Sequence, residues 1–234
     1  MKRIFLSLFV FFTFLFSNDF DTALGYYQSK NYAKALPLLE FLCEQSSSAK
    51  SCFLLGYMYE NGEGVSYSQD TAQRYYELSC DKKLSNACFN LALILESKDD
   101  IKNSRLNLYK ACSLEHLNAC KGLGMIYDEE KDGELALEFY KRACDLQDAN
   151  SCLRMGFLYR NGDIVKQNTH LAQKAYTKAC DLKDAKSCFV LAEFYLSEKN
   201  NRSAAKSNFG KSCDLGFSDG CVEYKKLLDN NISN

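Results

Sequence analysis

Twelve cysteines are the residues of this 234-residue chain whose type and spacing most directly predict chemistry. They fall into six pairs, separated by nine residues in the first pair and by eight in the others. Cysteines at a regular spacing form disulfides or bind zinc, depending on the redox compartment and on the gaps between them. The pairs are Cys43 and Cys52, Cys80 and Cys88, Cys112 and Cys120, Cys144 and Cys152, Cys180 and Cys188, and Cys213 and Cys221.

A disulfide within a pair requires the chain to reverse direction between its two cysteines. Eight residues along one helix span about 12 Å, whereas a disulfide holds its Cα atoms about 4.4–6.8 Å apart. The intervening segments, such as CDLQDANSC and CDLKDAKSC, carry the Asp, Asn and Ser that favour turns and helix starts. Ser151 and Ser187 stand where a cap of the following helix is expected.

Two alternatives to pairing between sequence neighbours remain open. A rival scheme, such as Cys52 with Cys80, joins two helices of one hairpin but leaves Cys43 and Cys221 without partners. Thiolate zinc sites usually have gaps of about two to four residues between ligands, so zinc is the less favoured reading of these cysteines. Neighbour pairing is favoured over both, and we expect no metal and no cofactor.

Catalytic motifs are weak in this sequence. Three Ser-x-x-Lys matches begin at Ser47, Ser79 and Ser203, but the Ser-Asp-Asn and Lys-Thr-Gly motifs of serine β-lactamases do not occur. The two histidines, His116 and His170, are expected to be solvated residues of a turn and of a helix start. No catalytic residue is assigned.

The cysteine pairs mark a repeat of helical hairpins. From the second to the sixth pair, the second cysteines recur after 32, 32, 36 and 33 residues, a period typical of helical arrays. After each second cysteine, Leu or Met recurs at +3, Gly or Ala at +4 and Tyr or Leu at +7, which is one helical face. We name these segments A helices; they are residues 52–62, 88–98, 120–130, 152–162 and 188–198.

A second helix, the B helix, is expected to end at each first cysteine. Ala stands eight residues before that cysteine in five of the six repeats, and Leu, Tyr or Phe stands four residues before it. Segments 61–70 and 161–170 contain turn residues and are expected to connect A to B. Each repeat is therefore an αα-hairpin that buries its apolar face only against neighbouring repeats.

The N-terminus is typical of a secretory signal. Lys2 and Arg3 precede an apolar run over residues 4–16, shorter than the roughly 20 residues of a bilayer-spanning helix. We expect cleavage after about Ser17, with an uncleaved membrane anchor as the alternative. The signal is therefore assigned to residues 1–17, and residues 18–234 to about six αα-hairpins and a C-terminal capping helix. Export to the periplasm or the medium also allows disulfides to persist.

The sequence LLGYMYENGEGVSYSQDTAQRYYELSC (54–80) resembles the Sel-one-like repeat, a relative of the tetratricopeptide repeat. With the paired cysteines and the signal, the chain resembles the Helicobacter cysteine-rich protein family over nearly its whole length after residue 19. Repeats 88–112 and 120–144 have shorter A–B connections and depart from the fuller pattern. The resemblance implies an all-α fold, a right-handed α-solenoid of αα-hairpins cross-linked by disulfides. It also implies penicillin binding with slow β-lactamase activity, or interaction with peptides and host proteins.

Composition excludes two classes of protein. Hydrophobic residues make up 47% of the chain and charged residues 25%, so an intrinsically disordered chain is not expected. The net charge of −1 does not favour nucleic acid as a partner. No membrane span is expected once the signal is removed.

A solenoid commonly binds its partners along the surface formed by one helix of each repeat. Positions +2 and +5 of the A helices vary in character and are expected to line part of such a groove. The best candidates are Tyr57, Asn90, Arg154 and Glu193, whereas apolar residues at these positions alternatively pack against adjacent repeats. The leading prediction is a binding module for a peptide, a protein or a peptidoglycan-related fragment. Hydrolysis of β-lactams is the alternative, and it rests on the resemblance alone.

Overall fold

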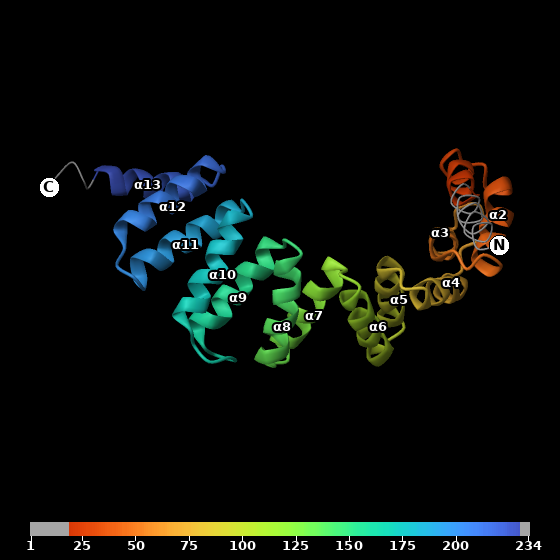
Figure 1. Cartoon of the computed structure of the whole chain (residues 1–234), viewed down its shortest axis with the longest axis horizontal. Helices are drawn as coiled ribbons and strands as arrows, with labels where there is room; N and C mark the ends of the chain where they lie inside the picture. Colours follow the sequence, from red (N-terminus) through yellow and green to blue (C-terminus); the bar gives the residue numbers. More distant parts are fainter. Residues whose placement is uncertain (1–18, 230–234) are drawn as a thin grey trace, which may run out of the picture. The chain divides into compact units, whose positions relative to one another are not determined.

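The computed structural model describes residues 19–229, and every regular element within them is a helix (Figure 1). The described residues belong to two compact units, 19–116 and 117–229. The predicted signal peptide, residues 1–17, lies outside the described residues. The assignment of residues 18–234 to about six hairpins and a capping helix stays a prediction for the chain as a whole.

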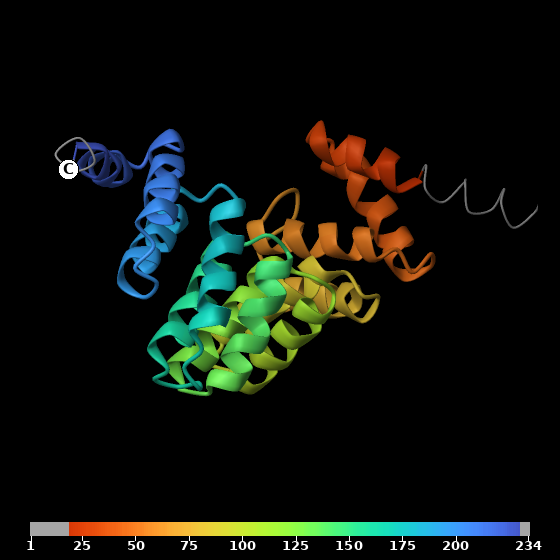
Figure 2. The same cartoon turned by 60° about the vertical axis from the view of Figure 1, so that its left-hand side comes forward.

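Helices of two kinds alternate along the chain. The B helices are α2 (Tyr32–Glu44), α4 (Gln69–Asp81), α6 (Ile101–Ser113), α8 (Gly133–Asp145), α10 (Thr169–Asp181) and α12 (Arg202–Asp214). The A helices are α3 (Ala49–Asn61), α5 (Ser85–Ser97), α7 (Leu117–Glu129), α9 (Ala149–Asn161), α11 (Ala185–Ser197) and α13 (Ser218–Asp229). Each A helix from α3 to α11 packs against the B helix that follows it, as Figures 1 and 2 show for α11 and α12.

Each unit buries its own apolar residues between consecutive helices. In the first unit, Ala23 from helical residues 19–28 shares a core with Ala35 and Leu39 of α2 and Leu55 of α3. In the second unit, a core over α9, α10 and α11 contains the fully buried Tyr176. The predicted fold class, an all-α solenoid of αα-hairpins cross-linked by disulfides, is confirmed.

Within each unit, disulfides connect a B helix to the next A helix. In Cys144–Cys152 and Cys180–Cys188 the Cα atoms are 4.8 and 4.5 Å apart, and both bridges are buried. The other bridges within a unit are Cys43–Cys52, Cys80–Cys88 and Cys213–Cys221. Cys112 and Cys120 are also disulfide-bonded, and none of the described cysteines is free.

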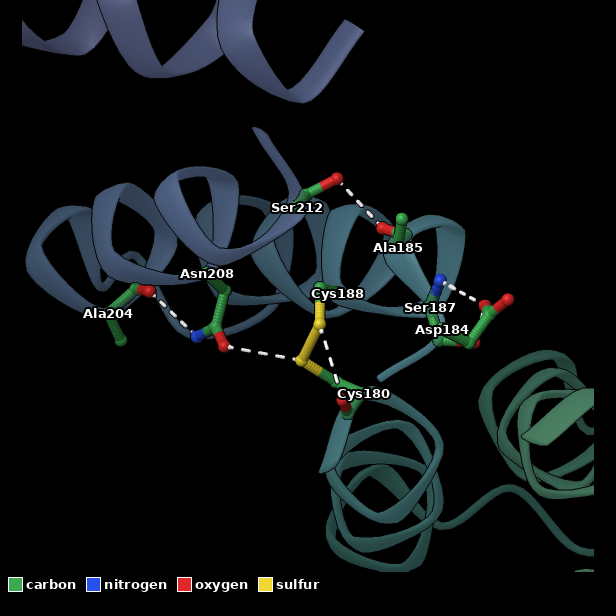
Figure 3. The surroundings of a disulfide bond; sticks show 8 residues. All are labelled: Cys180, Asp184, Ala185, Ser187, Cys188, Ala204, Asn208 and Ser212. Atoms are coloured by element: carbon green, nitrogen blue, oxygen red, sulfur yellow. Dashed lines mark hydrogen bonds between the residues drawn. A yellow bond between two sulfur atoms is a disulfide. The ribbon is translucent and has the colours of Figure 1, made fainter. Parts of the chain in front are cut away.

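The reversal between paired cysteines depends on one residue in the left-handed region. Lys83, Gln147 and Lys183 stand three residues after a first cysteine and have φ of 64°, 70° and 62°. A single left-handed residue ends the B helix and turns the chain, so that the next helix starts beside the last turn. Figure 3 shows the result at Cys180–Cys188, where the two cysteines come from helices that meet at their ends.

The helix caps differ from the sequence-based expectation. The caps of α9 and α11 are Asp148 and Asp184, and Ser151 and Ser187 lie in the first turn. The Asp184 carboxylate accepts a hydrogen bond from the Ser187 backbone N–H at 2.7 Å (Figure 3). Aspartate caps well because its oxygen reaches an otherwise unpaired N–H of the first turn, and the prediction placed this function three residues too late.

Close packing within a hairpin depends on glycine at position +4 of the A helix. A Cβ at Gly56 would lie 2.7 Å from the Tyr76 ring, and a Cβ at Gly124 would lie 2.6 Å from the Tyr140 ring. The hairpins with Ala92 and Ala192 at this position have Leu or Phe in place of that Tyr. Glycine therefore makes room for a tyrosine ring, as the pattern of small residues at +4 predicted.

Candidate functional site

The predicted binding positions lie on one stripe of the A helices. Positions +2, +5 and +8 after each second cysteine are three residues apart and share a helical face. We call this stripe the A face. Its members are Leu54, Tyr57 and Glu60 on α3; Asn90, Leu93 and Glu96 on α5; Gly122, Met125 and Asp128 on α7; Arg154, Phe157 and Arg160 on α9; and Val190, Glu193 and Leu196 on α11.

The four predicted residues occupy this stripe in different environments. Tyr57 is 38% exposed, and Glu193 is exposed. Asn90 is half-buried and lies beside the Tyr76 hydroxyl. The Arg154 side chain is 53% exposed and is paired with Asp128. Tyr57 and Asn90 belong to the first unit, and Arg154 and Glu193 to the second, so each unit presents two of them.

Apolar residues divide by position along the stripe. At +2, Leu54 and Val190 are 8% and 7% exposed, so these two pack into the core, as the alternative reading of the sequence expected. At +5, Leu93 and Met125 are 45% and 49% exposed. Position +5 is therefore where the A face exposes apolar side chains.

A polar cluster joins the α3–α4 hairpin to α5. The buried Tyr76 of α4 donates its hydroxyl hydrogen to Glu60 Oε2 at 2.5 Å, and Asn90 of α5 lies beside the same hydroxyl. Burial and the Glu60 carboxylate raise the pKa of Tyr76 far above its usual range, so the hydroxyl stays a donor. The cluster holds Glu60 and Asn90 in place at the surface of the A face.

The corresponding cluster in the second unit carries a cation. Tyr140 of α8 donates to Asp128 Oδ2 at 3.2 Å, and Arg154 Nε donates to the same oxygen at 2.7 Å. The hydrogen bond to Asp128 raises the pKa of Arg154, and burial with the Asp128 charge raises that of Tyr140 to about 12. The Asp128 side chain is 9% exposed, whereas the Arg154 side chain is half-exposed. The guanidinium is therefore bound to a buried carboxylate and is still accessible to solvent.

The third position of the series breaks the pattern. Tyr176 corresponds to Tyr76 and Tyr140, but Arg160 replaces the acid at +8 and Val190 replaces the polar residue at +2. Among residues 19–229, the Tyr176 hydroxyl is a buried polar atom without a hydrogen-bond partner. Burial raises its pKa to about 12, and the Arg160 charge opposes the shift. The exposed charge of the stripe therefore changes from one repeat to the next.

A pocket opens on the A face of the second unit. It has a volume of about 340 Å³ and lies over α7 and α9, with Tyr140 of α8 beside them. Arg154 lines it, as do Lys121 and Met125, which the sequence analysis did not select. The sequence carried a signal for it, because position +1 is Phe or Leu in the other four repeats and Lys121 only here.

The Ser-x-x-Lys serines serve local structure. Ser79 is buried and donates its hydroxyl hydrogen to the Ala49 carbonyl at 2.8 Å, as Ser212 does to the Ala185 carbonyl at 2.7 Å (Figure 3). Ser47 lies in a turn with φ of 52°, and Ser203 is exposed in the first turn of α12. These environments place none of the three as an activated nucleophile.

One of the two histidines is solvent-exposed as expected, and the other is half-buried. His170 is exposed in the first turn of α10, as expected. His116 is half-buried and stacks on the Phe89 ring at 4.4 Å between centroids, and burial lowers its pKa. The expectation of a fully solvated turn residue was therefore wrong for His116, since Phe89 at position +1 covers it.

A metal-binding cluster and a membrane-spanning helix are both absent from the part of the chain that the structure describes. Within 19–229, no cluster of three or more His, Cys, Asp or Glu side chains is placed to hold a metal ion. None of the described helices has the length and apolar character that crossing a bilayer requires.

Comparison with known proteins identifies the repeats. The Sel1 repeat model matches residues 49–84 and 149–184, and a tetratricopeptide repeat model matches residues 118–150. A Sel1 repeat protein from Oxalobacter formigenes has a similar fold, with a TM-score of 0.68, 23% identity, and coverage of 84% of this chain and 85% of that one.

Two further similarities are closer in sequence. Helicobacter pylori cysteine rich protein B is 30% identical, with 53% of this chain and 95% of that chain covered and a TM-score of 0.41. Human cytochrome c oxidase assembly factor 7 is 30% identical over 86 residues, which are 35% of this chain. Those residues span only 37% of the human protein. The repeat matches and the sequence identity support the family resemblance seen in the cysteine spacing.

Proposed function

We propose that this chain, which belongs to the Sel1-repeat proteins, is an exported interaction module that binds a partner polypeptide on its A face. The observation that carries the proposal is the exposure of apolar side chains at one register of successive A helices. Tyr57, Leu93 and Met125, all at position +5, are 38%, 45% and 49% exposed. Single exposed apolar residues are ordinary, whereas the same repeat position in both units favours a common use.

The polar clusters support the proposal, because they hold the neighbouring side chains in fixed places. In the first unit Glu60 accepts a hydrogen bond from the buried Tyr76 hydroxyl, and in the second Asp128 accepts one from the buried Tyr140 hydroxyl and one from Arg154 Nε. Side chains held in place lose little conformational entropy on binding. The A face therefore offers apolar contacts flanked by preorganised polar groups, which suits a polypeptide partner.

Export is proposed from two independent features. The first is the basic and apolar N-terminal segment, and the second is the disulfide bonding of all the described cysteines. Disulfides persist outside the cytosol. We expect intact-mass measurement of protein recovered from the cell envelope or the medium to give a chain that starts near residue 18. A cytosolic product that retains residues 1–17 would contradict the proposal.

Binding is tested by peptide display against the purified, oxidised chain. Peptides selected on the parent protein are expected to bind Tyr57→Glu and Leu93→Glu at least tenfold more weakly. Ile101→Glu and Leu106→Glu are the matched controls, because Ile101 and Leu106 are 47% and 53% exposed on the B helix α6. These controls are expected to bind as the parent does.

Two results would overturn the proposal. One is selection that enriches no peptide; the other is enriched peptides that bind the A-face variants as tightly as the parent. A muramyl dipeptide is included as a competitor, because a peptidoglycan-related ligand is the other occupant expected from the sequence. Binding of that compound alone would replace the polypeptide partner with a cell-wall fragment.

A further inference from the structure

The pocket over α7 and α9 lies where two other hairpins have an aromatic ring at the corresponding place. In the α3–α4 hairpin, the Phe53 ring packs on Tyr76 with centroids 5.6 Å apart. In the α11–α12 hairpin, Phe189 packs on Phe209 with centroids 5.2 Å apart. Both phenylalanines stand at position +1 of their A helices, so in these two hairpins this position supplies a ring that covers the aromatic residue of the B helix.

The α7–α8 hairpin has Lys121 at this position. Its side chain is 37% exposed and reaches Asp148 at 3.6 Å. Tyr140 is 4% exposed, whereas Tyr76 and Tyr176 are 0% exposed. The replacement of a ring by a lysine leaves a pocket of about 340 Å³ beside Tyr140 and the half-exposed Met125. This volume is at the low end for ligand sites and suits one or two side chains of a partner.

The charge of the pocket wall favours an anion next to that ring. Three cationic side chains and two carboxylates line it: Lys121, Lys131, Arg154, Asp128 and Glu129. Asp128 is already engaged by Arg154 Nε, which fixes the guanidinium with its other nitrogens toward the exposed side. A guanidinium held in this way binds a carboxylate through paired N–H groups.

We propose that this pocket binds an aromatic side chain of the partner together with a carboxylate beside it. The ring takes the place that Phe53 and Phe189 take in their own hairpins, against Tyr140 and Met125. The carboxylate, from a chain end or an acidic side chain, pairs with Arg154. This assignment rests on the proposed binding function and names the chemistry of the partner segment.

The test uses small probes that separate the ring from the charge. Binding of N-acetyl-phenylalanine, N-acetyl-phenylalanine amide, N-acetylglycine and N-acetyl-Phe-Glu amide to the ¹⁵N-labelled oxidised chain is followed by backbone amide shifts. We expect saturable millimolar shifts at Lys121, Met125 and Arg154 with at least one probe that carries both ring and carboxylate. The two probes that lack one group are expected to bind at least fivefold more weakly. The stronger of the two complete probes distinguishes a chain end from an acidic side chain.

Two variants examine the two halves of the site. Lys121→Phe supplies the ring that the α3–α4 and α11–α12 hairpins have, so we expect a folded protein that binds the complete probe at least tenfold more weakly. Arg154→Gln is expected to abolish the preference for the acid over the amide. Lys141→Phe, at an exposed position of α8 that does not line the pocket, is the control and is expected to bind as the parent does.

Equal binding of acid and amide by the parent, or unchanged binding by Lys121→Phe, would overturn the assignment. Failure of the pocket is distinguishable from failure of the proposed function, since the latter is measured at Tyr57 and Leu93 in the other unit. If display peptides lose affinity in the Tyr57 and Leu93 variants while every probe fails, the function stands and the pocket assignment is rejected.

Discussion

Replacing Gly124 with alanine tests the packing that holds the site together. A Cβ at this position would lie 2.6 Å from Tyr140 Cδ1 and 2.8 Å from Cε1, inside the 3.4 Å at which ordinary van der Waals contact begins. The ring has little room to move, because Tyr140 is 4% exposed and its hydroxyl is bonded to Asp128. Overpacking of this kind destabilises a protein by about 1–3 kcal/mol.

The net effect follows from two opposing contributions. The contact is shorter than van der Waals distance by more than half an ångström at two ring atoms, so the upper end of the range, about 3 kcal/mol, applies. Alanine in a helix interior is favoured over glycine by about 1 kcal/mol. We therefore expect Gly124→Ala to lower the free energy of unfolding by about 2 kcal/mol, the difference of these contributions.

The same helix supplies the control. Gly122 has nothing within 4 Å of its virtual Cβ, so Gly122→Ala is expected to gain up to about 1 kcal/mol from helix propensity. Both variants are measured by urea unfolding of the oxidised protein, followed by circular dichroism. Adding Tyr140→Leu to Gly124→Ala is expected to show a coupling energy of about 3 kcal/mol, because the overpacking is relieved while the gain in helix propensity remains. Equal stability of the two glycine variants would refute the account of the hairpin.

Three further outcomes are expected. Burial lowers the pKa of His116 in the folded state, so the unfolded state binds the proton more readily. The free energy of unfolding therefore falls as pH drops through the unfolded pKa of about 6.5. His116→Gln should lessen this fall, as measured by denaturation between pH 7.5 and 5. Tyr176→Phe should change the free energy of unfolding by less than about 0.5 kcal/mol, because the Tyr176 hydroxyl has no hydrogen-bond partner. Tyr76→Phe loses the hydrogen bond to Glu60 and should lower the free energy of unfolding by about 1–2 kcal/mol in the same urea assay. Mild reduction should open the half-buried Cys213–Cys221 bridge before the buried Cys144–Cys152 bridge. Alkylation followed by peptide mapping measures the order of opening. A reversed order, or different cysteine partners, would contradict the prediction.

The repeat architecture could be predicted because its signals are local and recur. Small residues at +4 and a Leu or Met at +3 mark the same face in each A helix, and the cysteine spacing demands a reversal that one left-handed residue supplies. These regularities can be recognised in the sequence without knowledge of tertiary contacts. The helix starts were less accurate, because Asp148 and Ser151 are both acceptable caps and only the backbone geometry distinguishes them.

The site was predicted only in part, because burial at a given position depends on neighbouring helices. Position +2 is exposed at Arg154 and buried at Val190, although both lie on equivalent helices. Asp128 was missed, since an acid near the end of an amphipathic helix is ordinarily solvated. Its value to the site comes from Tyr140 and Arg154, which approach it from two other helices. Lys121 differs from the Phe or Leu at +1 of the other repeats, but its significance became clear only from the ring contacts of Phe53 and Phe189.

The placement of the bridges has a mechanical consequence. A stretched chain transmits force through the sulfur atoms and bypasses the peptide between them. Eight residues extend to roughly 28 Å, whereas the Cα atoms of Cys144 and Cys152 stay 4.8 Å apart, so each junction withholds roughly 23 Å of reach. When optical tweezers unfold the hairpins one at a time, we expect the oxidised chain to lengthen in short steps. After reduction, we expect each step to be longer. The maximum extension of the stretched chain therefore depends on the redox state of its surroundings.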